Sequence, residues 1–263
     1  MRSKIFLVVL LFAGMVVPCS AADWQKTFTV SGKPTVRVET NDASVQVTGS
    51  DRHEVQVHVT AAGYRIGDQV KISERQNGDR VEVEVHVHRL AFVIGLPVHS
   101  VEIEVSVPRE SDLDIHSGDG RLEVLDVKGN THLATNDGRI RVSGADGILH
   151  ASSGDGSIEA DGRFDALDVE THDGRLRVSA QSGSKISGSG WNLSTHDGRV
   201  EVLVPEKLAA DLDAETHDGH VTVDIPVEVA GQFGGSRVRG KLNGGGPTLR
   251  IRTGDGSIHV GRN

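Results

Sequence analysis

The sequence predicts an all-β protein, a single-stranded parallel β-helix or β-solenoid in which short strands alternate with tight Asp-Gly corners. Three observations lead to this prediction. A four-residue corner recurs along the chain, alternating apolar residues flank its copies, and outward charges change sign from one copy to the next. Because parallel crossovers are nearly always right-handed, we expect right-handed coils. We also expect longer strands at the N-terminal end, where the repeat is less regular.

The repeated corner has four slots: Ser or Thr, then Gly, Asn or His, then Asp, and finally Gly. Gly, Asn and His tolerate a positive φ, and Asp can hydrogen-bond to its own turn, so the pattern predicts a tight corner with left-handed residues. An outlying copy, Thr40-Asn41-Asp42-Ala43, has alanine in the last slot. The regular copies carry the expected structural pairs Asp119 and Gly120, Asp137 and Gly138, Asp155 and Gly156, Asp173 and Gly174, Asp197 and Gly198, Asp218 and Gly219, and Asp255 and Gly256.

Apolar residues alternate with polar ones on both sides of the corners. Leu113 and Ile115 precede the first regular corner, and Leu122 and Val124 follow it. This period-two pattern, rich in β-branched residues, is typical of half-buried strands. The repeating unit is therefore a strand, an Asp-Gly corner and a second strand.

The spacing of the corners favours stacked coils over antiparallel hairpins. The corner aspartates from Asp119 to Asp173 follow one another at intervals of 18 residues, and the later intervals up to Asp255 are 24, 21 and 37. In a parallel stack, equivalent side chains on neighbouring coils lie about 4.8 Å apart, so alternating charges attract each other along the stack. The outward residue three places after the corner glycine alternates in this way: Glu123, Arg141, Glu159, Arg177 and Glu201.

The patterns divide the chain into a signal peptide at 1–21, a strand-rich region at 24–110 that is continuous with the solenoid, and the Asp-Gly repeats at 111–263. An apolar segment at 90–97 is expected to be either a buried connection or an exposed tip for a partner. Two Gly-rich interruptions, at 179–190 and 231–246, account for the longer corner intervals. We expect both to form surface loops.

The N-terminus has the features of a secretory signal. Arg2 and Lys4 precede an apolar run from Ile5 to Val17, and small residues follow. This run has 13 residues, whereas a membrane-spanning helix needs about 20. We therefore expect an exported protein of the periplasm, the cell surface or the medium, with no transmembrane span after cleavage. Lipoprotein anchoring through Cys19 is a less favoured alternative, because a proline precedes this cysteine. The net charge of −9 argues against a nucleic-acid partner.

Two segments resemble a known family: residues 107–124, which include the first regular corner, and the Thr-His-Asp-Gly-Arg-Leu-Arg-Val stretch at 171–178. They are similar to the bacterial putative-adhesin β-strand-repeat family, a domain of unknown function found in exported and membrane-linked proteins. The resemblance covers roughly residues 35–260. It implies a β-helix-like solenoid and brings no catalytic residues or cofactors with it.

The favoured function is that of a non-enzymatic envelope or cell-surface module, adhesive or structural, that binds an unknown protein or polysaccharide. One alternative is a divalent-metal ladder on the corners, formed by Asp119, Asp137, Asp155, Asp173, Asp197 and Asp218 with His172, His196 and His217. Each corner offers one carboxylate, however, whereas Ca²⁺ prefers about six to eight oxygens. A polysaccharide-active β-helix enzyme is less favoured still, because the acids fall on regular turns or outward positions and no catalytic motif is present.

Overall fold

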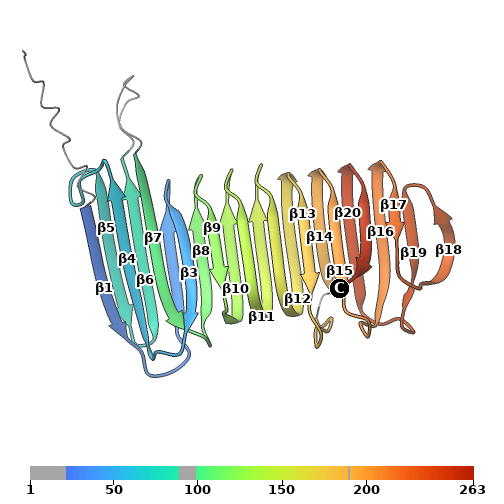
Figure 1. The fold of residues 1–263 in the computed structure, drawn as a ribbon, viewed down its shortest axis with the longest axis horizontal. Coiled ribbons are helices and arrows are strands. Elements are labelled where there is room, and N and C mark those ends of the chain that lie inside the picture. Colours follow the sequence, from blue (N-terminus) through green and yellow to red (C-terminus); the bar gives the residue numbers. More distant parts are fainter. Residues whose placement is uncertain (1–21, 89–98, 189) are drawn as a thin grey trace, which may run out of the picture.

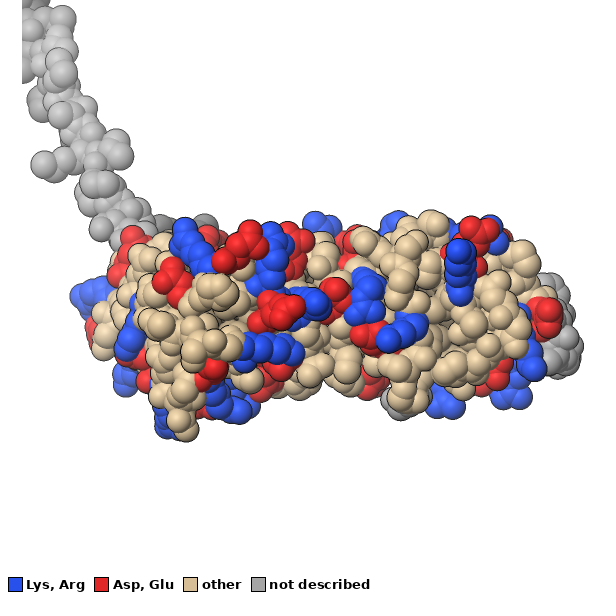
Figure 2. Space-filling model, turned by 90° about the horizontal axis from the view of Figure 1, so that it is seen from below, with Lys and Arg blue, Asp and Glu red and all other residues tan. Residues whose placement is uncertain are grey.

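The computed structural model describes residues 22–88, 99–188 and 190–263, so the expected signal peptide with Cys19 and the apolar segment at 90–97 lie outside the described residues. The described chain forms 21 strands arranged side by side in an elongated stack (Figure 1). The view from below is elongated as well (Figure 2). Within the described residues, no helix is long and apolar enough to cross a membrane.

The strands form two stacks, here named sheet I and sheet II, which the corners connect. Sheet I contains, in spatial order, β5 (Val70–Asn77), β6 (Arg80–Val87), β2 (Thr35–Thr40), β8 (Asp112–Ser117), β10 (Lys128–Thr135), the second halves of β11 (Ile140–Ser153) and β12 (Ile158–Asp173), β14 (Trp191–Asp197), β20 (Thr248–Asp255), β16 (Ala210–Asp218), β19 (Arg237–Leu242) and β18 (Glu228–Gly234). Sheet II contains β1 (Ala22–Thr29), β4 (Glu54–Ala62), β7 (Ser100–Pro108), β3 (Ser44–Ser50), β9 (Leu122–Leu125), the first halves of β11 and β12, β13 (Leu176–Ala180), β15 (Val200–Val204), β21 (Ile258–Arg262) and β17 (Val221–Val223).

Strands of neighbouring coils pair in parallel and in register through most of both sheets, so equivalent side chains form rows along the stack. One inward row of sheet II contains Val45, Leu122, Ile140, Ile158, Leu176, Val200 and Ile258, all of them buried. Burying such a side chain contributes about 1.5–3 kcal/mol. Because each side chain of a row packs mainly against the equivalent side chains of the adjacent coils, a single coil would have little core of its own.

The spatial order of the coils differs from their order in sequence at two places. The coil formed by β2 and β3 lies between β6 and β7 on one side and β8 and β9 on the other. The coil formed by β20 and β21 lies between β14 and β15 on one side and β16 and β17 on the other. The expectation that each coil lies on the preceding one therefore holds from β8 to β15 and is wrong at both ends.

Antiparallel strands cover parts of the two ends. At the N-terminal end, β1 pairs with β4, β4 with β7, and β5 with β6, all antiparallel. At the other end, β19 pairs antiparallel with β16 and β18 pairs with β19. The Gly-rich interruption at 231–246 is thus largely strand rather than loop. Its strands pair on the edge that β16 would otherwise expose.

The longest strands lie in the middle of the molecule and not at the N-terminal end as expected. β11 and β12 have 14 and 16 residues, whereas the strands from β1 to β7 have 6 to 9. Each of the two long strands turns from sheet II into sheet I, and the pairing between them continues on both sides of the bend with local interruptions. Glycines with a positive φ, Gly144 and Gly147, and local register shifts accommodate this bend in β11. Right-handed coiling stays a prediction.

Candidate functional site

The first slot of each corner links neighbouring coils through its hydroxyl group. Thr171 donates hydrogen bonds to the carbonyl oxygens of Gly154 and Gly156 on the adjacent coil, at 3.0 and 2.9 Å. Ser153 donates to the carbonyl oxygen of Gly138 and accepts one from the Gly156 amide within its own corner. Equivalent bonds run along the stack from the hydroxyls of Ser117, Thr135, Thr195, Thr216 and Thr253. We name this series the hydroxyl ladder; the slot was not assigned a role from the sequence.

All of the corner glycines are needed for close packing between coils, and three of them also have a positive φ. The second slot, for example Asn136 and His172, does not have a positive φ. Among the corner glycines, Gly198, Gly219 and Gly256 have φ values of 158°, 155° and 151°, whereas Gly120, Gly138, Gly156 and Gly174 do not have a positive φ. A Cβ atom on Gly156 would lie 1.9 Å from the carbonyl oxygen of Gly138 on the adjacent coil, and equivalent distances at the other corner glycines range from 1.7 to 2.3 Å. The expected left-handed conformation is therefore wrong for the second slot and holds only for three of the glycines; every regular corner requires glycine because no side chain fits between the two backbones.

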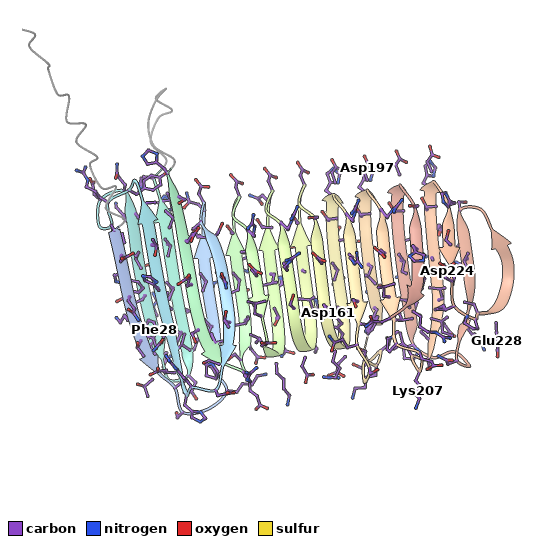
Figure 3. All side chains as sticks on the ribbon, in the orientation of Figure 1. Phe28, Asp161, Asp197, Lys207, Asp224 and Glu228 are labelled. Carbon is purple, nitrogen blue, oxygen red and sulfur yellow. The ribbon has the colours of Figure 1, made fainter. Side chains whose placement is uncertain are left out.

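The corner aspartates form one row, here named the Asp column. In spatial order it contains Asp42, Asp119, Asp137, Asp155, Asp173, Asp197, Asp255 and Asp218. All but the first of these residues are exposed. Asp197 is labelled at the upper edge of the molecule in Figure 3.

The structure places the corner histidines differently from the sequence prediction. The imidazole rings of His172 and His196 stack at 5.0 Å between centroids, on adjacent coils. The coil containing Asp255 lies between those of Asp197 and Asp218, so His217 is not on the coil next to His196. Among the described residues, the corner Asp and His side chains do not bring three ligand atoms close enough to hold a metal ion.

The charge alternation predicted from the sequence is present on the outer face of sheet II. Arg141 pairs in register with Glu123 on one side and Glu159 on the other, and Arg177 pairs with Glu159 and Glu201. The side chains of Arg141 and Glu159 form an ion pair at 2.9 Å, and those of Arg177 and Glu201 one at 3.7 Å. A hydrogen bond and the charge of Glu159 raise the pKa of Arg141 above its usual value. These rows stabilise the stacking of neighbouring coils.

The outer face of sheet I carries a row that was missed in the sequence. Along the stack it contains Arg75, Glu82, Arg37, Asp114, His132, His150, Asp168, Asn192, Arg250, Asp213 and Arg239. Asp114, His132, His150 and Asp168 succeed one another at intervals of 18 residues, the same interval as the corners. Reading every outward slot at this interval would have found them.

Asp114 is the centre of a cluster within this row. Its Oδ1 atom lies 2.7 Å from Nε2 of His116 and 3.1 Å from Nδ1 of His132, while Arg37 donates to its Oδ2 atom at 3.0 Å. Partial burial raises the pKa of the Asp114 carboxyl, but hydrogen bonds from His132 and His116 and the charges of His116 and Arg37 outweigh it, and the pKa is lowered. Asp114 therefore carries a negative charge at neutral pH.

The edge opposite the corners is also charged, and acidic and basic side chains are interspersed on it (Figure 2). Arg163 in β12 forms hydrogen bonds with both carboxylate oxygens of Asp165, at 2.7 and 2.9 Å, and a further one with Asp146 of β11. Lys185, in the loop that follows β13, lies 3.7 Å from Asp165. The hydrogen bonds and charge of Arg163 lower the pKa of Asp165 despite its partial burial. These contacts connect adjacent coils and leave these charged side chains little capacity to bind a ligand.

The stacked coils and their Asp-Gly corners define an all-β, solenoid-like repeat protein. A family model described as Toastrack DUF4097 matches residues 35–261, and the chain belongs to this family. The membership confirms the family resemblance of the repeats.

The solved structures that match the chain share little sequence with it. A "putative cell adhesion protein" of Clostridium sporogenes is 14% identical with a TM-score of 0.45, and the match covers 93% of this chain and 100% of that one. A "putative lipid binding protein" of Parabacteroides distasonis is 13% identical with a TM-score of 0.43, covering 90% and 96%. A "putative adhesin" of Bacteroides fragilis is 9% identical with a TM-score of 0.36, covering 93% and 99%. No curated protein matches the chain.

Proposed function

We propose that the protein is a non-enzymatic interaction module of the bacterial envelope or cell surface, and that its corner edge contacts an extended macromolecule. The observation that carries this proposal is the Asp column, in which exposed carboxylates recur in register along the length of the stack. Neighbouring members lie on coils about 4.8 Å apart. A partner with its own repeat, such as a polysaccharide or an extended polypeptide, could engage several of them at once.

A basic row runs beside the Asp column. Arg121, Arg139, Arg175 and Arg199 each follow a corner glycine directly, and all four are exposed. Arg139 donates a hydrogen bond to the hydroxyl of Ser157 on the adjacent coil at 3.1 Å, so the row is aligned along the stack. The edge thus offers hydrogen-bond acceptors and donors in two parallel lines. Many weak contacts made together by a rigid array can give strong binding, since later contacts form at a high effective concentration.

The same regularity argues against catalysis. Paired catalytic carboxylates need two different environments that separate their pKa values. The members of the Asp column instead occupy equivalent, exposed positions on successive corners. We therefore propose recognition rather than bond cleavage as the role of this edge.

The proposed location depends on the N-terminal segment. Residues 1–21 have the charge, the apolar run and the small residues of a secretory signal. We propose export to the periplasm, the cell surface or the medium, with anchoring through Cys19 as the less favoured arrangement. Labelling with a membrane-impermeant reagent and fractionation of the producing cells test this part separately.

Binding of the purified protein to isolated envelope fractions, cell-wall polysaccharide and membrane separately, tests the function. A triple variant, Asp137→Asn, Asp155→Asn and Asp173→Asn, removes three adjacent charges of the Asp column. We expect its binding to fall at least about tenfold, because several contacts are lost together. The matched control removes three charges from the outer face of sheet II, by Glu123→Gln, Glu159→Gln and Glu201→Gln, and should bind as the unaltered protein does. Equal binding by both variants, or none by the unaltered protein, would contradict the proposal.

A further inference from the structure

We infer that Asp114, His116 and His132 form a binding site for one divalent transition-metal ion, for which Zn²⁺ is the suitable probe. One ligand atom from each of the three residues lies within 4.8 Å of the other two. Both imidazole nitrogens point at the same carboxylate oxygen, Oδ1 of Asp114, at 2.7 and 3.1 Å. We name this group the Asp114 site.

The spacing of the ligand atoms suits a small transition-metal ion. Nitrogen and oxygen ligands lie about 2.0–2.2 Å from Zn²⁺, and in a tetrahedral site this places neighbouring ligand atoms about 3.3 Å from each other. The separations from Oδ1 of Asp114, 2.7 and 3.1 Å, are somewhat shorter than that value, and the two nitrogens lie within 4.8 Å of each other. The three ligand atoms are therefore near enough for one ion to bind all of them once the side chains adjust.

The backbone holds the three side chains on one face of sheet I. Asp114 and His116 are two residues apart on β8, so both point outward from the same strand. His132 is the in-register partner of Asp114 on β10. Because two paired strands supply the ligands, the site is built on rigid elements and not on a loop. A bound ion would also link two adjacent coils.

Arg37 supports the carboxylate from the side away from the histidines. It donates to Oδ2 of Asp114 at 3.0 Å, which leaves Oδ1 facing the two imidazole rings. Glu39 lies 3.1 Å from the guanidinium group and offsets part of its charge. Ligating carboxylates are commonly hydrogen-bonded in this way through outer-shell partners, which orient the ligand atom.

The chemistry of the ligands selects the class of ion. Imidazole nitrogen suits Zn²⁺, Cu²⁺ and Ni²⁺, whereas Ca²⁺ and Mg²⁺ prefer sites built from oxygen. His132 has half of its side-chain surface exposed (51%), so one side of the site is open to solvent. Three protein ligands with an open position are typical of a site that keeps a water or accepts a ligand from another molecule.

The next position along the row provides a matched control. His150 is the in-register partner of His132 and its side chain is exposed to the same extent, 51%. It lies 3.6 Å from Asp168, but its ring centroid is 6.4 Å from that of His132 and it does not belong to the three-ligand group. Replacing His150 therefore removes an equivalent surface imidazole without removing a ligand of the Asp114 site.

Titration of the purified protein, produced from the full chain, with Zn²⁺ against a chromogenic chelator tests the inference. We expect one tight site per chain, no competition from Mg²⁺, and an affinity loss of more than about tenfold in His116→Ala and His132→Ala, because even outer-shell changes at metal sites cost this much. His150→Ala should keep the affinity of the unaltered protein. So should His196→Ala, which disrupts the stacked histidines of the corner edge.

Circular dichroism of each variant establishes that it is folded. Where His132→Ala is not folded, His132→Gln retains a polar side chain and removes the ring nitrogen, and it takes the place of the alanine variant. The inference is overturned if the unaltered protein binds no Zn²⁺ stoichiometrically or if folded His132 variants bind it as tightly. It is equally overturned if His150→Ala or His196→Ala weakens binding as much as His132→Ala does, since the ion would then bind to surface histidines in general.

Discussion

Between β8 and β15 each coil lies on the coil that precedes it in the chain, whereas at both ends of the stack the chain leaves this order. In the middle, hydrogen bonds between corners join residues 15 to 23 positions apart, such as Thr171 with Gly156 and Thr195 with His172. At the C-terminal end, a hydrogen bond from Arg199 reaches Ser257, which is 58 positions away. The same corner chemistry therefore serves two different chain topologies.

The comparison shows that coils far apart in the sequence can be neighbours when their corners are complementary. The corner containing Asp255 fits between those of Asp197 and Asp218 because it offers the same hydroxyl, glycine and aspartate slots. Inserting a late coil between two earlier ones places parallel pairings across longer loops, which costs more chain entropy on folding. The ends should consequently depend on specific contacts that the middle does not need.

The largest effect on stability should come from placing a charge in the hydrophobic core of the middle coils. Leu176 is fully buried between Ile158 and Val200, and Leu176→Asp would place a charge there. We expect a loss of about 4 kcal/mol or more in the free energy of unfolding, enough to unfold the central coils. A thermal melt followed by circular dichroism measures this. Arg175→Asp, one residue away and exposed, should melt nearly as the unaltered protein does; an unchanged melt of Leu176→Asp would show that the strand is misplaced.

The second prediction compares substitutions in the last slot of a middle corner and of the outermost corner. Gly156→Ala would bring a Cβ atom to 1.9 Å from the carbonyl oxygen of Gly138, and we expect it to cost about 3 kcal/mol because backbone must move. The last slot of the outermost corner already holds an alanine, Ala43. Ala43→Gly should cost less than about 1 kcal/mol, through chain entropy. Denaturant unfolding of the two variants compares them, and equal costs would contradict the packing argument.

A third change tests how the C-terminal end keeps its order. Asp213 of β16 accepts hydrogen bonds from Arg252 of β20 at 2.7 Å and from Arg239 of β19 at 3.1 Å, so it joins β16 to two strands that do not follow it directly in the chain. Asp213→Asn should cost about 2 kcal/mol at neutral pH, since hydrogen bonds to a charged group are lost. Hydrogen exchange should show the loss in β16, β19 and β20 and leave β8 to β13 protected as before.

The contribution of Asp213 should depend on pH. Partial burial raises its pKa, but the hydrogen bonds and charges of Arg252 and Arg239 outweigh this, and the pKa is lowered in the folded protein. The stabilisation is therefore present above the pKa of the unfolded chain, about 4, and it is lost as the pH falls further, through the folded value. The difference in stability between the unaltered protein and Asp213→Asn should shrink in acid; a difference that is the same at pH 7 and pH 3 would contradict this account.

The smallest effect is expected in the hydroxyl ladder, where substitutions at two of its positions are compared. Thr171→Val removes the donor to two carbonyl oxygens of the adjacent coil and should cost about 1 kcal/mol. Thr40 occupies the same slot at the end of the ladder, and its buried hydroxyl has no hydrogen-bond partner in the described part of the chain. Thr40→Val should therefore be neutral or slightly stabilising. A larger loss in Thr40→Val than in Thr171→Val, measured by denaturant unfolding, would remove the ladder as a source of stability.

The middle of the molecule was predictable from sequence because its signals are local and periodic. The 18-residue interval and the alternating charges from Glu123 to Glu201 identify parallel stacking before any coordinates are known. The order of the end coils was not predictable, since the pattern around Asp218 and Asp255 is compatible with either position. Glycine was correctly predicted as the corner residue, but the φ argument applies to only three of the corners. The main reason could not be read from the sequence, because the close approach of Gly156 to Gly138 exists only between coils.

The Asp114 site was missed for a related reason. Only the slot after each corner was followed from coil to coil, and Asp114 and His132 occupy a slot before the corner. Their 18-residue separation carries the signal that they are neighbours. That His116 joins them follows from the period of two along a strand, whereas the support from Arg37 depends on the inserted position of β2 and could not be read from spacing.

The central claim is that equivalent corners form one column in which Asp255 lies next to Asp197. Parallel neighbours are about 4.8 Å apart, within the range of about 4.4–6.8 Å between Cα atoms that a disulfide spans. In the double variant Asp197→Cys and Asp255→Cys, oxidation followed by peptide mapping should find the two cysteines linked, and in Asp197→Cys and Asp218→Cys it should not. A link between positions 197 and 218 with none between 197 and 255 would show that the coils follow sequence order and would contradict the account.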